Sequence, residues 1–169
     1  FVEDRLETCL TLDAAGINWR QDDDGDLHVI VTPDEGKPLH VFFRALEPEG
    51  ERILLVVVFD VLPGLDTPAL LPLSRTTVLE TLNWLHQRRL GVTFHISKHN
   101  YVACRCDFPV YGRPRREQVE TMFSLVLSAA SQAQAALRAV LQGASLEQAL
   151  RLVAEFPEPS SADDEDAAT

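Results

Sequence analysis

Hydrophobic and polar positions change their spacing several times along the chain, and each change predicts a different kind of element. Residues 2–15 carry apolar side chains at helical intervals, and Gly16 is a suitable end for that helix. The next 45 residues instead read as strands, in which apolar and polar positions alternate. Turns divide this region at Asp24-Gly25, at 34–37 and at 48–50. The pattern therefore predicts one helix followed by three or four strands.

The stretch from Ile53 to Val61 lacks this alternation, because nearly every residue in it is apolar and many are β-branched. Such a run is typical of a central strand that is covered on both faces. The long helix and the first helix of the chain could cover one face each. If the helices cover only one face, a second copy of the chain or a bound peptide is needed for the other. A peptide could also add to an edge of the sheet.

A proline-rich connection then leads to a second helix, which Ser74 is expected to cap and Gly91 to end. Helical spacing predicts that the core stripe of this helix consists of Val78, Leu79, Leu82, Leu85 and His86.

The last part of the chain is predicted to contain a hairpin and two further helices. Two strands at 92–97 and 101–108 flank a turn at 98–100, and a long helix runs from Pro114 to about Gln142. Small residues fill the second half of the long helix, so another helix can approach it closely. Ser145 and Gln148 form a capping-box signature for a final short helix that ends near Phe156. We expect this final helix, rather than a second copy of the chain, to pack on the small residues.

These elements predict an α+β fold with an antiparallel sheet, in the order α-β-β-β(-β)-α-β-β-α-α. Strands that are joined by short turns must be antiparallel, and helices that are segregated from a run of strands are typical of this class. Residues 1–156 are expected to form a single domain. Residues 157–169 are too polar and too acidic to pack, so we expect a disordered acidic tail.

The net charge of −11 restricts the partners of the chain. The tail supplies −5 of it, from Glu158, Asp163, Asp164, Glu165 and Asp166. Such a field repels phosphate, which disfavours direct nucleic-acid binding and favours a basic protein partner, including one that handles nucleic acid. Keeping the protein dissolved is the alternative role of the charge. The chain has no run of about 18 apolar residues, so we expect no membrane span. Three cysteines without framework spacing favour a reducing cytoplasm.

Sequence motifs for catalysis are absent, and we expect no cofactor and no enzyme activity. The chain contains no glycine-rich phosphate loop, no His-Glu-x-x-His and no Gly-x-Ser-x-Gly. The run from Asp22 to Asp26 lacks the ligands of a calcium loop at positions 20 and 31, which are Arg20 and Val31, so it is interpreted as a solvated hairpin tip. Cys9 lies on the apolar side of its predicted helix without a charged partner, which disfavours a nucleophile.

The residues His95, His99, Cys104 and Cys106 suggest a zinc site, because they are close in sequence and are ligands that zinc favours. A three-residue hairpin turn, however, pairs Phe94 with Cys104 and puts both thiols on the apolar face. His95 then points to the other face, so the ligands do not converge. Buried inert thiols are the favoured interpretation, and a metal-dependent regulator or enzyme remains an alternative.

Candidate interface residues are found on the second helix and on the apolar strands. Trp84 is predicted to point away from the core stripe, with Arg88 beside it, and an outward tryptophan is a frequent interface anchor. A loop or helix of the same chain could cover it instead. On the strands, the candidates are Phe42, Leu55, Val57 and Phe59.

Several of these residues resemble a known family. The stretch Leu79-Glu80-Thr81-Leu82-Asn83-Trp84-Leu85, the Leu90-Gly91 pair, and the hairpin that ends in Cys106-Asp107-Phe108-Pro109 before a long helix are similar to the YbjN-like family of bacterial sensory transduction regulators. The resemblance covers roughly residues 2–142. It implies a fold similar to that of type III secretion chaperones, no catalytic residues, and a dimeric adaptor that binds another protein.

The leading hypothesis is therefore a non-enzymatic, chaperone-like regulator that forms a homodimer and binds a second protein. The alternatives are the metal-dependent regulator or enzyme described above, and an acidic nucleic-acid mimic in which the tail occupies a basic protein.

Overall fold

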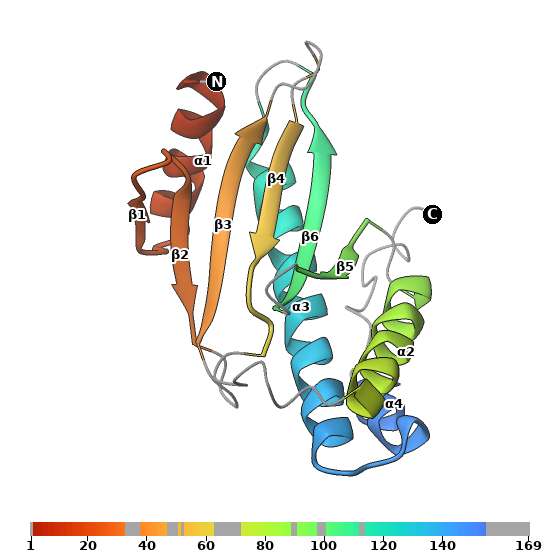
Figure 1. Ribbon diagram of the computed structural model, residues 1–169. Coiled ribbons are helices and arrows are strands. Elements are labelled where there is room, and N and C mark those ends of the chain that lie inside the picture. Colours follow the sequence, from red (N-terminus) through yellow and green to blue (C-terminus); the bar gives the residue numbers. More distant parts are fainter. Residues whose placement is uncertain are drawn as a thin grey trace, which may run out of the picture.

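Six antiparallel strands form one sheet, and helices pack against it (Figure 1). The computed structural model describes residues 2–32, 38–46, 51, 53–62, 72–88, 91–97, 101–111 and 114–154. The strand order is β1-β2-β3-β4-β6-β5, so β1 and β5 are the edges. In chain order, the elements are α1 (Val2–Ala14), β1 (Trp19–Gln21), β2 (Leu27–Val31), β3 (Leu39–Leu46), β4 (Ile53–Val58), α2 (Pro72–Arg88), β5 (Thr93–Ile96), β6 (Val102–Pro109), α3 (Arg116–Leu141) and α4 (Leu146–Ala154).

This order confirms the predicted α+β class, with four strands before α2. Several predicted features lie outside the described residues. They are the turns at 34–37 and 48–50, the Pro63 and Pro68 part of the connection, the hairpin tip at 98–100, the end of the last helix near Phe156, and the tail at 157–169.

Helix α3 covers one face of the sheet, and Figure 1 shows it behind the strands. It contacts β4 and β6, and α1 contacts α3. Alternate residues of each strand point toward α3, as the period of a strand requires. Val41, Val56, Val58 and Cys104 are fully buried on this side, and the ring of Phe43 meets that of Phe123 in α3 at 5.6 Å between centroids. The core therefore lies between α3 and the centre of the sheet.

The opposite face of the sheet is not covered by any helix in the part of the chain that the structure describes (Figure 1). Of the two alternatives left open by the sequence, the one in which α1 and α3 cover one face each is thus wrong for the described elements. The second face lacks a helix because α1 packs beside α3 on the same side of the sheet, where Leu12 joins the core with Leu27 and Val29.

Helix α4 packs on the second half of α3, as expected from the small residues there. Small side chains let the two helix axes approach closely, because no bulky group separates the backbones. Ala149 and Val153 of α4 are buried in the core cluster. The buried alanines of α3 are Ala129, Ala130, Ala133 and Ala136.

The predicted capping box of α4 is confirmed. The backbone N–H of Gln148 donates to the Ser145 hydroxyl at 3.2 Å, and the backbone N–H of Ser145 donates to Oε1 of Gln148 at 2.9 Å. Both donors would otherwise lack a partner at the first turn.

Helix α2 differs from its prediction in two ways. It begins at Pro72, so Ser74 lies inside the helix and is not its cap; a proline fits the first turn because its missing N–H would have no partner there. Its core stripe is also rotated, since Leu79 is 48% exposed and His86 is exposed. Thr81 is buried instead, and its hydroxyl donates to the Thr77 carbonyl at 2.7 Å, which satisfies the polar group inside the core.

The turn between β1 and β2 is held together by Asp22. Its Oδ1 accepts the backbone N–H of Asp26 at 2.8 Å and that of Asp24 at 3.1 Å, while Gly25 adopts a φ of 84°. The interpretation of residues 22–26 as a wholly solvated tip is wrong at Asp26. That residue is 6% exposed, and its carboxylate forms an ion pair with Arg44 of β3.

None of the helices described here combines the length and the apolar character needed to cross a bilayer.

We predict that Ser145→Ala destabilises the protein by about 1 kcal/mol, because the N–H of Gln148 loses its acceptor at the start of α4. Urea unfolding measured by circular dichroism checks this value. Ser128→Ala is the matched control, since Ser128 is an exposed residue inside α3, where alanine is the better helix former. Equal loss of stability in both variants would contradict the capping role.

Candidate functional site

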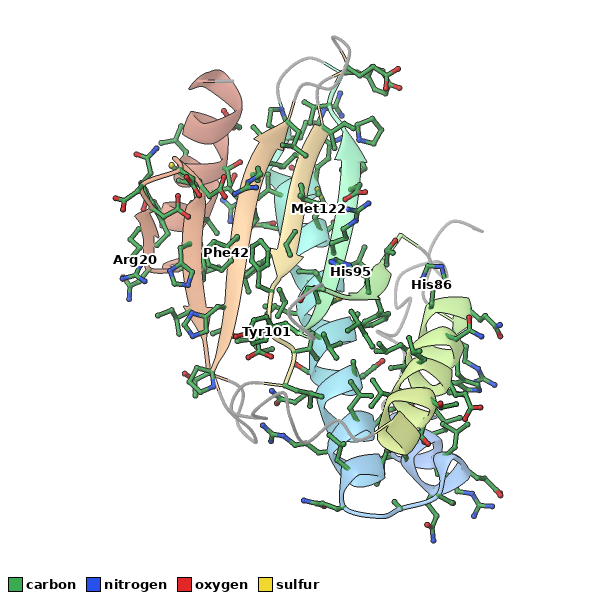
Figure 2. All side chains as sticks on the ribbon, viewed as in Figure 1. Arg20, Phe42, His86, His95, Tyr101 and Met122 are labelled. Carbon is green, nitrogen blue, oxygen red and sulfur yellow. The ribbon has the colours of Figure 1, made fainter. Side chains whose placement is uncertain are left out.

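The face of the sheet that points away from α3 is the candidate site and is called the open face below. It carries apolar side chains that no described helix covers, and Figure 2 shows this face toward the viewer. Ile30 is 53% exposed and Phe59 is 47% exposed, while Leu55 of β4 is half-buried. An apolar surface of this kind on a sheet is typical of a binding site for another macromolecule.

Aromatic rings are stacked across the middle of the open face. The ring of Phe42 lies parallel to that of His28, with 4.4 Å between centroids and 7° between planes. Phe59 meets the other side of this group edge-on, at 5.0 Å and 79° from Phe42. The register explains the first contact, because His28 and Phe42 are directly opposite each other in β2 and β3.

A chain of polar contacts joins β1, β2 and β3 on the same face. Nε of Arg20 donates to Nδ1 of His28 at 2.9 Å, and Nε2 of His28 lies 3.0 Å from Nδ1 of His40. The guanidinium can only donate, so Nδ1 of His28 must carry no proton. Neutral His28 then carries its proton on Nε2, and this N–H donates a hydrogen bond to Nδ1 of His40. The two rings are inclined by only 16°, with centroids 5.1 Å apart, so they meet edge to edge as this hydrogen bond requires.

The environment of His28 favours this neutral form. Burial, followed by the positive charge of Arg20 and the neighbouring His40, lowers the pKa of His28 below its ordinary value, and Asp22 opposes this in part. Protonation would place an N–H against the Arg20 N–H and remove the acceptor. His28 therefore keeps the Arg20 side chain oriented only while it is neutral.

Other charges on the open face are paired. Arg44 donates from Nε to Asp26 at 2.7 Å, and this hydrogen bond raises the pKa of Arg44. Arg105 and Asp107, both in β6, form an ion pair at 3.0 Å. Together with Arg20, these groups sum to +1, from three arginines and two aspartates. The open face is thus close to neutral on a chain of net charge −11.

The structure brings four of the six sequence-predicted interface residues to the open face. Phe42, Leu55 and Phe59 present apolar surface there, and Val57 lies between them but is only 4% exposed. Val57 therefore fills space between its neighbours on this face and offers little contact area of its own. Their function as an interface stays a prediction.

Trp84 and Arg88 lie on α2, away from the open face. The prediction that Trp84 points away from the core is wrong, because its ring is half-buried and packs against the core cluster. The Arg88 guanidinium covers the ring at 4.3 Å from its centre. The burial of Thr81 explains the difference, since it rotates the core stripe of α2 toward Trp84.

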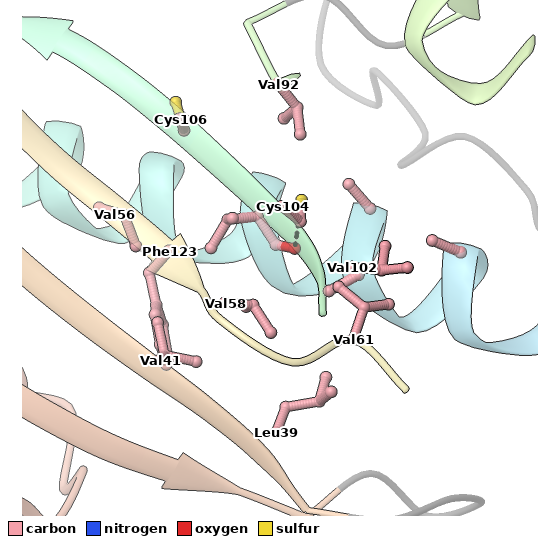
Figure 3. Packing of buried hydrophobic residues seen from close by; sticks show 14 of the residues in the cluster. Leu39, Val41, Val56, Val58, Val61, Val92, Val102, Cys104, Cys106 and Phe123 are labelled. Carbon is pink, nitrogen blue, oxygen red and sulfur yellow. Dashed lines mark hydrogen bonds between the residues drawn. The ribbon is translucent and has the colours of Figure 1, made fainter. Parts of the chain in front are cut away.

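The hairpin of β5 and β6 has the predicted register, with Phe94 opposite Cys104 and His95 opposite Ala103. Both thiols are buried on the α3 side among valines, as Figure 3 shows. Burial raises the pKa of Cys104 and of Cys106, so both stay protonated near neutral pH. His95 points to the open face, and His99 lies outside the described residues. Among the residues that are described, no three potential metal ligands gather at one point.

Sequence reasoning missed the contacts of Arg20, His28 and His40. A signal was present, because His28 and His40 both occupy polar positions of alternating strands. Their meeting depends on the register of β2 against β3, and the turn that joins these strands does not fix it by sequence alone.

The lowered pKa of His28 predicts that acid destabilises the fold. Between the folded pKa and the ordinary value of 6.5, the unfolded chain binds more protons, so the free energy of unfolding rises with pH and is lost as pH falls through this window. His28→Gln keeps an acceptor and a donor but does not titrate, so it should flatten the slope. Part of the slope should remain, because burial also lowers the pKa of His95. Urea titrations between about pH 5 and 8 measure it, and identical slopes in both proteins would contradict the assignment.

Comparisons with known proteins agree with the resemblance seen in the sequence. The model of the YbjN family, described as "Putative bacterial sensory transduction regulator", matches residues 4–139. A crystal structure of YbjN from E. coli, described as "a putative transcription regulator", is 14% identical and has a TM-score of 0.49; the match covers 79% of this chain and 89% of that one. A search of curated proteins found no match. Because the family match spans most of the chain, including the whole sheet and most of α3, the chain belongs to the YbjN family of bacterial regulators.

Proposed function

We propose that the chain is a non-enzymatic, chaperone-like adaptor that forms a homodimer through its open face and binds a second protein through the acidic remainder of its surface. The observation that carries the proposal is an apolar surface on a sheet face without a described helix, formed by exposed Ile30 and Phe59 and half-buried Phe42 and Leu55. Packing this surface against another sheet removes it from water, which is the main favourable term in association.

The charge of the open face supports a second copy as the occupant. Two chains of net charge −11 repel each other, and the repulsion is smallest where the local charge is near zero. The open face meets this condition, since Asp26 neutralises Arg44 and Asp107 neutralises Arg105. A basic protein would gain little at such a surface.

The remainder of the chain carries the acidic charge, so a basic partner would bind there. Apart from the five groups counted above, the charged side chains of the chain sum to −12. A basic protein, including one that handles nucleic acid, fits the charge of this acidic exterior. In this arrangement the dimer presents two acidic outer surfaces and hides its neutral one.

We predict that Phe59→Asp converts the dimer to a monomer, because it places an unpaired carboxylate in the centre of the apolar contact. The free energy of dimer association should become less favourable by at least about 2 kcal/mol, which is a roughly 30-fold rise in the dissociation constant. Light scattering coupled to gel filtration gives the mass. Leu79→Asp on α2 is the matched control, since Leu79 is 48% exposed where Phe59 is 47% exposed.

A monomeric wild type, or a dimer that both variants leave intact, would contradict the open face as the dimer surface. Capture of partner proteins by the wild type and by Phe59→Asp then shows whether partner binding needs the dimer.

The acidic nucleic-acid mimic is a second candidate, favoured by the five acidic residues of the tail. We predict that deleting residues 157–169 leaves partner capture at no less than about half of the wild-type level, because an exposed charge interaction contributes little by itself. Quantitative pull-down with both chains measures this. Complete loss of capture on deletion would favour the mimic over the adaptor.

A further inference from the structure

Arg20 differs from the other arginines of the open face. Arg44 and Arg105 each pair with an aspartate, whereas Arg20 makes no ion pair with a carboxylate among the described residues. Its Nε is engaged by Nδ1 of His28 at 2.9 Å. This contact leaves the two terminal nitrogens of the guanidinium pointing outward, and Figure 2 shows the Arg20 side chain at the edge of the sheet.

A surface pocket of about 380 Å³ opens beside this guanidinium, and it is lined by Asn18, Trp19, Arg20, His28 and Ile30. The indole N–H of Trp19 donates to Oδ1 of Asp13 at 2.8 Å, so the donors that this lining offers are the guanidinium and the Asn18 amide, while Ile30 supplies apolar surface. His28 has no nitrogen to spare, because one accepts from Arg20 and the other donates to His40. The pocket therefore offers a fixed donor fork beside an apolar wall.

The chemistry of this lining fits a carboxylate. A guanidinium presents two parallel N–H groups that match the two oxygens of a planar carboxylate. A phosphate would bring up to two negative charges, whereas the pocket supplies one arginine. Asp22 is also close enough for its negative charge to act on the His28 ring, so it would repel a second negative charge. A single negative charge is the better match for a single positive one.

We propose that Arg20 and Asn18 form a carboxylate-binding subsite at the β1 edge of the open face, which takes an acidic side chain of the second copy bound there. This inference rests on the proposed function, because the open face must bind protein for the subsite to be used. His28 acts as a positioning residue that holds Arg20 and does not touch the carboxylate.

Titration with sodium acetate, followed by NMR of the Arg20 Nε–H and the Asn18 amide, tests the subsite. Wild type should show saturating shifts of both groups. Arg20→Lys keeps the charge but loses the fork, so its affinity for acetate should be weaker by at least about threefold; Arg20→Gln should abolish saturation. Arg105→Gln is the matched control on the same face and should bind acetate as wild type does.

Inorganic phosphate is the second probe, and it should bind more weakly than acetate at the same ionic strength. Shifts that never saturate in wild type, equal saturation in Arg20→Gln, or tighter binding of phosphate would each overturn the carboxylate subsite. The proposed function fails separately, by a monomeric wild type in light scattering. A protein that dimerises through Phe59 but ignores acetate would keep the function and lose the subsite.

Discussion

The packing of α3 against one face of the sheet is the contact on which the rest of the structure depends. Val56 and Val58 of β4 are fully buried beneath it, and its alanine-rich half receives α4. Because α1 joins the same side, the helices form one layer and the sheet another. This arrangement buries much of one set of alternating side chains, including Val41, Val56 and Val58, whereas Ile30 and Phe59 of the other set are exposed.

Much of this fold could be predicted from the sequence, because the relevant signals are local. The capping box of Ser145 and Gln148 needs only four residues, and the pairing of Phe94 with Cys104 follows from a short hairpin. The Ser74 cap failed for a local reason, because the helix begins at Pro72, but the other predictions that failed depend on tertiary contacts. Thr81 became a core residue because a hydroxyl that bonds to its own helix can be buried, and this rotated Trp84 inward. The spacing of apolar residues cannot predict this hydrogen bond, so it could not predict that Thr81 is buried.

The candidate site was predicted in its apolar part and missed in its polar part for the same reason. Each of Phe42, Leu55 and Phe59 could be chosen from its own position in an apolar stretch of the sequence, without knowing its neighbours in the sheet. The contact of His28 with His40 appears only when β2 and β3 are set in register, twelve residues apart in the chain. The carboxylate of Asp26 was likewise assigned to solvent, since its pairing with Arg44 spans two strands. In both cases the partners come from neighbouring strands, so the strand order had to be known first.

The lengths of the two outermost strands limit how such a protein can associate. β1 has three residues and β5 has four, whereas β3 and β6 inside the sheet have eight each. An edge this short offers few unpaired backbone groups, so adding strands side by side gains little and fibre-like growth is discouraged. Stacking through the flat surface, by contrast, is complete once two molecules have met about a twofold axis. The short edges therefore disfavour growth by strand addition, and they leave the open face as the larger surface for association among the described elements.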